Sequence, residues 1–364
     1  MKKCTIGSRR KIMEWHSSFR KEYGSISNFE SPKILSHEIY SSKLVDSITH
    51  DNSIVFMHGI LGSKKNFRTA AKQIITEKYH FNTSVTLDHR GHGNSNIPPF
   101  LDGPIQNNVS SCAEDIHHLF SQPHLKLLGN TPMVLCGHSF GGKVALMYLK
   151  HCIASGRPLP QHTWILDSIP GTYNKSLDAM QKHDSSVTYV LESVRRLYAM
   201  PTDVFRCKDS VVQALLSRDI SMGMVQWIAT NLVPVEDGHE KAKRVRFSFD
   251  INTIVDLFDD FCGLDMWDFV HDFARMESQQ PATIHFIRAG RNTLWDPSAV
   301  AALKTLSAES SATSTYVSSP SSSASRTSPT NKVLLHHMEH VGHWLHAEDL
   351  HGLLAIIARH SSLQ

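Results

Sequence analysis

Residues 133–142 read MVLCGHSFGG, and they join a short apolar run to a helical pattern over Lys143–Lys150. A serine on a sharp turn between a strand and a helix needs an unusual backbone conformation. Gly137 and Gly141, two residues before and after Ser139, remove the Cβ atoms that would clash there. The pattern therefore predicts a strand, an exposed Ser139 hydroxyl on a tight turn, and a helix N-terminus with its partial positive charge beside it.

Short apolar runs recur along the chain and alternate with segments of helical periodicity. Such alternation predicts an α/β fold, with a mostly parallel open sheet flanked by helices on both faces. Each run ends where polar or glycine residues begin, at the strand ends where these folds place their chemistry. The other runs are Ile54–Met57, Val85–Leu87, Trp164–Leu166, Ile284–Ile287 and Val333–Leu335.

The rhythm of the runs divides the chain into parts. We predict a basic N-terminal extension over residues 1–32 and a first part of the core over 33–169. Residues 170–250 form a helical cap or lid, and residues 251–364 complete the core. Residues 307–331, rich in Ser, Thr, Ala and Pro, are expected to form a disordered surface loop. Aromatic and apolar residues of the cap either line a pocket or pack the cap's own core: Tyr189, Tyr198, Phe205, Trp227 and Ile228.

The composition excludes several classes of protein. The 364 residues carry 37 Lys plus Arg against 34 Asp plus Glu, which gives no basic excess for nucleic acid. No run approaches the roughly 20 apolar residues that would span a bilayer. The six cysteines are widely spaced and suit a reducing compartment. The 24 histidines exceed the roughly eight expected, which raises metal binding or pH sensing as possibilities.

A second turn supports the first. The segment His58–Ser63, HGILGS, follows the run Ile54–Met57 directly. In enzymes with a serine on a strand-to-helix turn, such an early turn supplies a backbone amide for an oxyanion, and the residue after the serine supplies another. We assign these amides to Ile60, with Leu61 as the alternative, and to Phe140.

The base and the acid are expected later in the chain, since this architecture places serine, acid and histidine in that order. His343 lies in a loop after the last strand, and His340 and His346 compete with it. His336, Glu339 and His340 also match an inverted zinc-protease spacing, but that motif needs a helix where the sequence reads as a strand. We therefore expect no metal.

Three carboxylates are candidates for the acid. Asp167 directly follows the run Trp164–Leu166. Asp250 follows Phe247-Ser248-Phe249, and Asp296 lies six residues beyond Gly290. The residues alone leave these alternatives open.

The chain resembles the α/β-hydrolase superfamily, in particular the branch that contains alpha/beta hydrolase domain-containing protein 11 and small bacterial esterases. The resemblance rests on several blocks: residues 56–67 (FMHGILGSKKNF), 88–95 (DHRGHGNS), 137–143 (GHSFGGK), 167–170 (DSIP), 230–232 (TNL) and 342–346 (GHWLH). It implies a serine hydrolase, without a cofactor, that acts on esters or thioesters of modest acyl size.

The resemblance also bears on the acid. In relatives a serine often stands at the strand-end position that Thr293 occupies here. This favours Asp167, although some relatives have an acid that matches Asp250. The predicted mechanism uses Ser139 as nucleophile, His343 as base and Asp167 to orient it.

Two rivals remain. One is a non-catalytic receptor or scaffold on the same fold, and the other is different triad chemistry, such as acyl transfer or a lyase step. The expected partner is a small acyl ester or thioester, and no motif predicts an oligomeric state. The basic first 22 residues and the relatives favour mitochondria over the cytoplasm within an intracellular location.

Overall fold

The protein is described by a computed structural model over residues 35–42, 52–76, 78–95, 106–122, 125, 133–175, 187–235, 244–315 and 329–361. The predicted basic extension, residues 1–32, lies outside this part of the chain. Within the described residues, no helix combines the length and the apolar character needed to cross a membrane.

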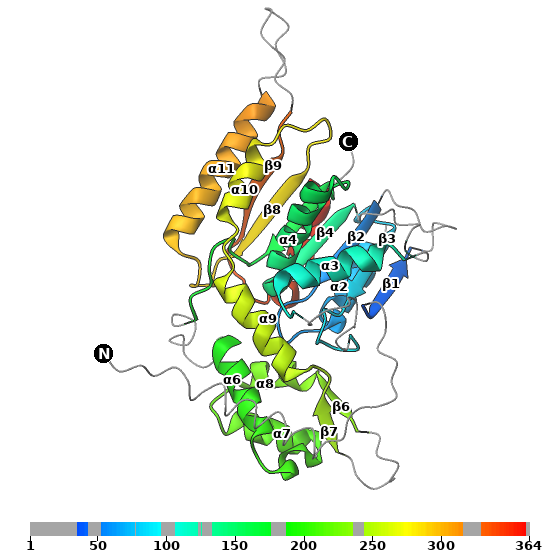
Figure 1. Ribbon diagram of the computed structural model, residues 1–364, viewed down its shortest axis with the longest axis vertical. Coiled ribbons are helices and arrows are strands. Elements are labelled where there is room, and N and C mark those ends of the chain that lie inside the picture. Colours follow the sequence, from blue (N-terminus) through cyan, green and yellow to red (C-terminus); the bar gives the residue numbers. More distant parts are fainter. Residues whose placement is uncertain are drawn as a thin grey trace, which may run out of the picture.

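One large sheet organises the molecule (Figure 1). Its strands lie in the order β1-β3-β2-β4-β5-β8-β9, and only β1 is antiparallel to its neighbour. Gly137 pairs with Met57 on one side and with Ile165 on the other, so the carboxyl ends of three strands lie level. The strands are β1 (His37–Ser41), β2 (Ser53–Met57), β3 (Thr83–Leu87), β4 (Val134–His138), β5 (His162–Leu166), β8 (Thr283–Ala289) and β9 (Lys332–Met338).

Helices cover both faces of the sheet and bury two apolar clusters. One face packs against α3 (Val109–Phe120), α4 (Phe140–Ser155), α9 (Ile251–Gly263), α10 (Trp267–Arg275) and α11 (Pro297–Thr315). The other face packs against η2 (Lys64–Phe67), α2 (Arg68–Ile74), α12 (Leu345–Glu348) and α13 (Leu350–His360). Strands β2, β3 and β4 are buried along their whole length because helices lie on both sides, which explains the apolar runs that they contain. The predicted α/β fold is confirmed.

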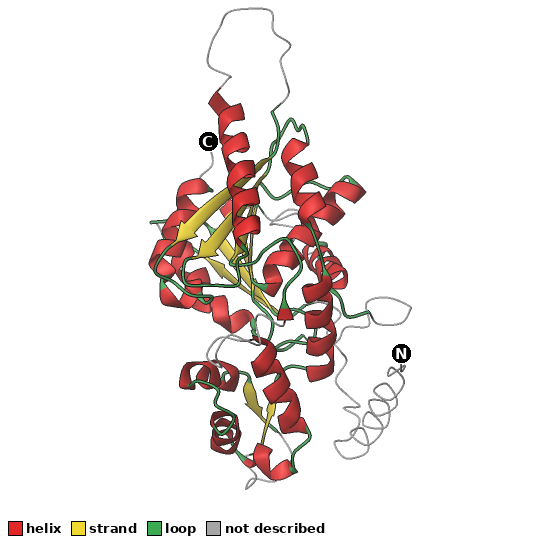
Figure 2. Ribbon diagram, turned by 90° about the vertical axis from the view of Figure 1, so that its left-hand side faces the viewer, coloured by secondary structure: helices red, strands yellow, loops and turns green. Residues whose placement is uncertain are grey.

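An insertion between β5 and β8 lies beyond the carboxyl ends of the strands (Figure 1). It contains α6 (Val187–Tyr198), η4 (Thr202–Arg206), α7 (Lys208–Leu216), α8 (Met222–Ala229) and a hairpin of β6 (Leu232–Pro234) with β7 (Val245–Phe247). The insertion is helical, as predicted, and it adds a short antiparallel pair of strands that the sequence did not predict; Figure 2 shows these strands beside the helices, apart from the large sheet. Three-residue strands are too short for an alternating pattern to reveal them. The domain boundaries stay a prediction.

The serine-rich segment is partly ordered, which corrects the predicted loop over 307–331. Helix α11 continues to Thr315, because Leu303, Leu306 and Ser310 form a buried face. The Ser310 hydroxyl accepts a hydrogen bond from the Val333 amide of β9 at 3.1 Å. At the other end, Asn331 is buried, and its side-chain oxygen accepts from the Ala282 amide at 2.9 Å. Residues 316–328 lie outside the described part.

Candidate active site

Ser139 stands between β4 and α4 in a strained conformation, with φ 52° and ψ −114°. The flanking glycines are required by close backbone approaches. A Cβ on Gly137 would lie 2.1 Å from the Gly141 carbonyl oxygen, and one on Gly141 would lie 2.7 Å from the Met57 oxygen. The Ser139 side chain is half-buried at the start of α4. Backbone strain at a positive φ often marks a functional position.

Asp167 directly follows β5 and has its carboxylate fully buried among donors. Oδ1 accepts hydrogen bonds from the Ala289 amide at 3.0 Å and from Trp295 Nε1 at 2.7 Å. Oδ2 accepts from Asn292 Nδ2 at 2.6 Å and lies 2.7 Å from His343 Nδ1. Four donors on one carboxylate fix its orientation.

His343 lies in the loop between β9 and α12, and hydrogen bonds hold both its ring and its backbone. Because an ionised carboxylate only accepts hydrogen bonds, the contact with Asp167 assigns the proton to Nδ1 of His343 and leaves Nε2 to act as an acceptor. The backbone oxygen of His343 accepts from His138 Nε2 at 2.7 Å. Within the described residues no hydrogen bond joins Ser139 to His343, and such bonds are often long in unliganded sites. Both residues line the same cavity, of about 20 Å³.

The other candidates for acid and base lie elsewhere. Asp250 caps the N-terminus of α9 through the Asn252 amide at 3.0 Å, and Asp296 accepts from the Ser298 amide at 2.9 Å beside α11. His340 is exposed on a turn. His346 is buried and stacks on Phe67, with ring centroids 4.6 Å apart, and burial lowers its pKa to about 3.

The residues of the inverted zinc-protease spacing do not lie on a helix, which that motif requires. His336 lies in strand β9, so it shares no helix face with His340. Of the three carboxylates considered as the acid, Asp167 is the one that contacts a candidate histidine, His343.

The two predicted oxyanion amides are free of other partners in the described structure. The Leu61 amide, the alternative to Ile60, donates to His92 Nε2 at 3.2 Å. No hydrogen bond within the described residues engages the amide of Ile60 or Phe140. Of the two alternatives, the Leu61 amide is thus already engaged, and the assignment of the oxyanion amide to Ile60 stays a prediction.

Buried histidines build the turns around these amides. His58 Nδ1 donates to the Gly59 oxygen at 2.8 Å, while its Nε2 accepts from the His89 amide at 3.1 Å. Burial lowers the pKa of His58 to about 4 and that of His92 to about 3. Both imidazoles are therefore neutral connectors between the loops that follow β2 and β3.

A buried residue of the insertion reaches the same turn. Asn231, between α8 and β6, donates its side-chain amide to the Leu61 oxygen at 2.9 Å. The sequence predicted no role for Asn231, nor for Asn292 and Trp295, which donate to Asp167. The block Thr230-Asn231-Leu232 belongs to the resemblance and was the available signal for Asn231.

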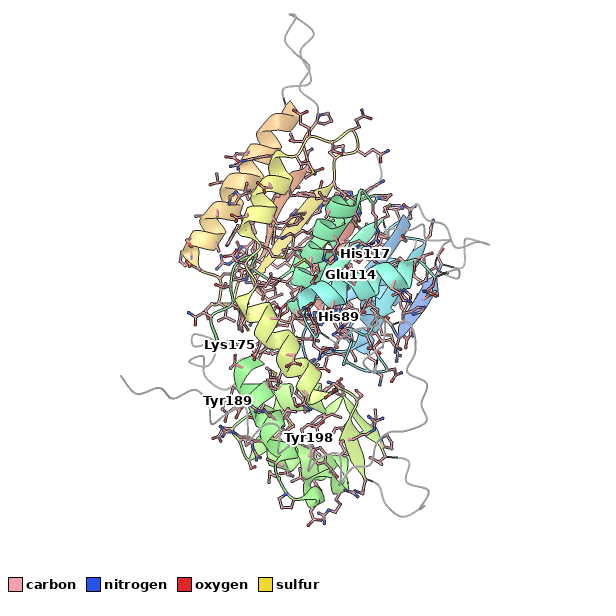
Figure 3. The ribbon with its side chains drawn as sticks, in the orientation of Figure 1. His89, Glu114, His117, Lys175, Tyr189 and Tyr198 are labelled. Carbon is pink, nitrogen blue, oxygen red and sulfur yellow. The ribbon has the colours of Figure 1, made fainter. Side chains whose placement is uncertain are left out.

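Of the five candidate pocket walls in the insertion, Trp227 lines the cavity at Ser139. Phe205 and Ile228 are buried in the large apolar cluster, and Tyr198 packs on Phe205 with ring centroids 5.5 Å apart. The Tyr189 hydroxyl donates to the Arg218 oxygen at 2.6 Å. Both tyrosines belong to the insertion (Figure 3), where they pack its own core.

Two cavities meet at His343. The smaller one contains Ser139 and is walled by Ile60, Phe67, Trp227 and Trp344. The larger, of about 300 Å³, is lined by Tyr173, Arg291, Thr293 and Leu294. Val187, His343 and Trp344 line both.

Comparison with known proteins agrees with this architecture. A family described as the alpha/beta hydrolase fold matches residues 52–152. The chain is 33% identical to the sn-1-specific diacylglycerol lipase ABHD11 of Danio rerio over 116 residues. This matched segment covers 32% of this chain and 31% of that protein. Ethanol acetyltransferase 1 of Kluyveromyces lactis is 34% identical over 118 residues, 30% of this chain and 28% of that protein. The matches span less than a third of these relatives.

A solved structure extends the likeness to most of the chain. An esterase from a marine microorganism superposes with a TM-score of 0.61 at 15% identity, covering 90% of this chain and 98% of that one. The chain has the α/β-hydrolase fold, and its resemblance to the branch that contains ABHD11 is confirmed.

Proposed function

We propose that the protein is a serine hydrolase that cleaves carboxylic esters or thioesters of modest acyl size through an acyl-enzyme. The observation that carries the proposal is the 2.7 Å contact between Asp167 Oδ2 and His343 Nδ1. His343 and Ser139 line the same cavity. The curated relatives include a lipase and an acetyltransferase, both of which act on acyl groups by name.

The proposed reaction follows from the proton positions. Ser139 Oγ attacks the acyl carbonyl while His343 Nε2 takes the hydroxyl proton, and Asp167 stabilises the imidazolium that results. The amides of Ile60 and Phe140 donate to the oxyanion, and each such donor typically contributes about 3 kcal/mol. His343 then returns the proton to the leaving alcohol or thiol. In the second half, His343 takes a proton from water as the water oxygen attacks the acyl carbonyl, and it then gives that proton to Ser139 Oγ as the bond between Ser139 and the acid breaks.

A fluorophosphonate probe tests the nucleophile. We expect the wild type to be labelled on Ser139, and Ser139→Ala to lose both labelling and turnover of 4-nitrophenyl acetate. The matched control is Ser168→Ala, a buried serine beside Asp167. Equal labelling of the wild type and Ser139→Ala would refute the assignment, and a single reaction without sustained turnover would favour the non-catalytic receptor.

Acyl transfer is the second candidate, since an acetyltransferase is among the relatives. The acyl-enzyme is the same, and an alcohol takes the place of water in the second half. Product analysis with 4-nitrophenyl acetate and increasing ethanol separates the two reactions. Ethyl acetate as the main product at low ethanol concentration would establish transfer over hydrolysis.

The location is a separate part of the proposal. The basic residues among the first 22 support a mitochondrial address over a cytoplasmic one. Residues 1–34 fused to a fluorescent protein should co-localise with a mitochondrial dye, and diffuse cytoplasmic fluorescence would refute the address.

A further inference from the structure

The site has two unequal compartments that meet at His343. The small compartment, of about 20 Å³, holds Ser139, while the large one, of about 300 Å³, is lined by the loop after β8. Trp344 lines both compartments, and its ring lies 5.8 Å from that of Trp227 in α8, centroid to centroid. These walls come from the core and from the insertion.

Resting on the proposed function, we propose that the substrate is an ester of a two- or three-carbon acyl group with a larger, uncharged, polar alcohol. The acyl group occupies the small compartment, and the alcohol occupies the large one. Arg291 and Thr293 are the residues of the large compartment that select the alcohol.

The size of the small compartment limits the acyl group. A reacting carbonyl carbon must lie about 3 to 3.5 Å from Ser139 Oγ, with its oxygen directed at the amides of Ile60 and Phe140. The space of about 20 Å³ is little more than the minimum that one water molecule needs, so little room remains for carbons beyond the acyl carbonyl. Phe67 and Trp227 stand on the walls of the compartment, so a long acyl chain that enters it would have to displace an aromatic ring.

The position of the leaving group follows from the proton that it receives. His343 gives its proton from Nε2, so the leaving oxygen must face that atom. The rest of the alcohol then continues past His343. The adjoining space that His343 itself lines is the large compartment.

The charges of the large compartment cancel. Arg291 lies 2.5 Å from Glu348, which also accepts a hydrogen bond from the Gly342 amide at 2.9 Å. A charged alcohol would meet an ion pair whose two charges offset each other, so the pair favours neither sign of charge. Hydroxyl groups on the alcohol, by contrast, can bond to the exposed Thr293 and to the polar edge of the pair.

Two series of esters measure these preferences in the wild-type protein. Across ethyl acetate, butyrate and octanoate, we expect kcat/KM to fall at least about tenfold from first to last. At constant acetyl group, we expect glyceryl triacetate to exceed ethyl acetate, acetylcholine and O-acetyl glycolate, each by about tenfold.

Variants connect the preferences to the two compartments. Trp227→Ala should raise the ratio of kcat/KM for octanoate to acetate about tenfold, because it opens the small compartment. Thr293→Trp should lower the ratio for glyceryl triacetate to ethyl acetate about tenfold, while Thr293→Ser retains the wild-type ratio. Met222→Ala, on the exposed side of α8, is the control with unchanged turnover of every ester.

The outcomes separate the two proposals. Without turnover of any ester or labelling of Ser139, the proposed function fails and this inference with it. With turnover, equal kcat/KM for octanoate and acetate overturns the acyl assignment. A glyceryl triacetate preference that Thr293→Trp does not change overturns the assignment of the alcohol.

Discussion

Mild acid should destabilise this protein well before its carboxylates titrate. His58, His92 and His346 are buried and neutral, and burial lowers their pKa values to about 4, 3 and 3. In the unfolded chain each imidazole has a pKa of about 6.5. Below about pH 6.5 these imidazoles bind protons in the unfolded state but not in the folded state. Stability is therefore lost as the pH falls from about 6.5 toward the folded pKa values.

The magnitude follows from the linkage relation. Between pH 7.5 and 5.5, each of the three imidazoles lowers the free energy of unfolding by about 1.4 kcal/mol, or about 4 kcal/mol together. This is a large part of the 5 to 15 kcal/mol that is typical of folded domains. Burial also lowers the pKa values of His89, His138 and His285, which lie outside this sum.

Urea unfolding followed by circular dichroism at pH 7.5, 6.5 and 5.5 measures the loss. His346→Phe, which keeps an aromatic ring against Phe67, should remove about 1.4 kcal/mol of the difference between the two end points. His340→Gln, at an exposed position, is the matched control and should leave the difference as in the wild type. An unfolding free energy that is equal at pH 7.5 and 5.5 would refute the reasoning.

Three further substitutions test the site. Asp167→Asn should lower kcat for 4-nitrophenyl acetate by about 10⁴, because it loses the acceptor that fixes the His343 tautomer, and an unchanged kcat would exclude Asp167 as the acid. Gly137→Ala should cost about 3 kcal/mol or more, because its Cβ would lie 2.1 Å from the Gly141 oxygen; urea unfolding measures this, with the exposed Gly223→Ala in α8 as control. Asn231→Ala should cost about 1 to 3 kcal/mol of stability, since it leaves the buried Leu61 oxygen without this donor, and it should also lower kcat, whereas a wild-type kcat would exclude support of the oxyanion turn.

Local patterns were sufficient for six strands of the large sheet and for the serine turn, whereas the edge strand β1 was not predicted. The predicted runs Ile54–Met57 and Trp164–Leu166 lie within β2 and β5, because strand residues that are buried on both faces of a sheet form short apolar runs. The turn at Ser139 could be predicted because the glycine at position 137 is required by a backbone approach within the same short segment, that of the Gly141 oxygen. Information of this kind is contained in neighbouring residues.

Contacts between distant segments could not be predicted in the same way. Asp167 differs from Asp250 and Asp296 by its donors, which come from residues 122 to 176 positions further along the chain. The helix over Ser307–Thr315 escaped prediction because a serine-rich composition suggests disorder, whereas Ser310 there bonds to β9. In both cases the partner, and not the local sequence, decides the structure.

The hydrogen-bond partner of the ring also distinguishes His343 from the buried histidines around it. His58 and His92 donate from Nδ1 to backbone oxygens, and their Nε2 atoms accept backbone amides, so both nitrogens are occupied by neutral groups. Burial without a bonded carboxylate then disfavours the imidazolium. His343 has the same Nδ1 geometry, but its acceptor is the ionised Asp167 and its ring borders a cavity. An imidazole that must hold a proton for part of a reaction needs that anion, which makes His343 the proposed base among its buried neighbours.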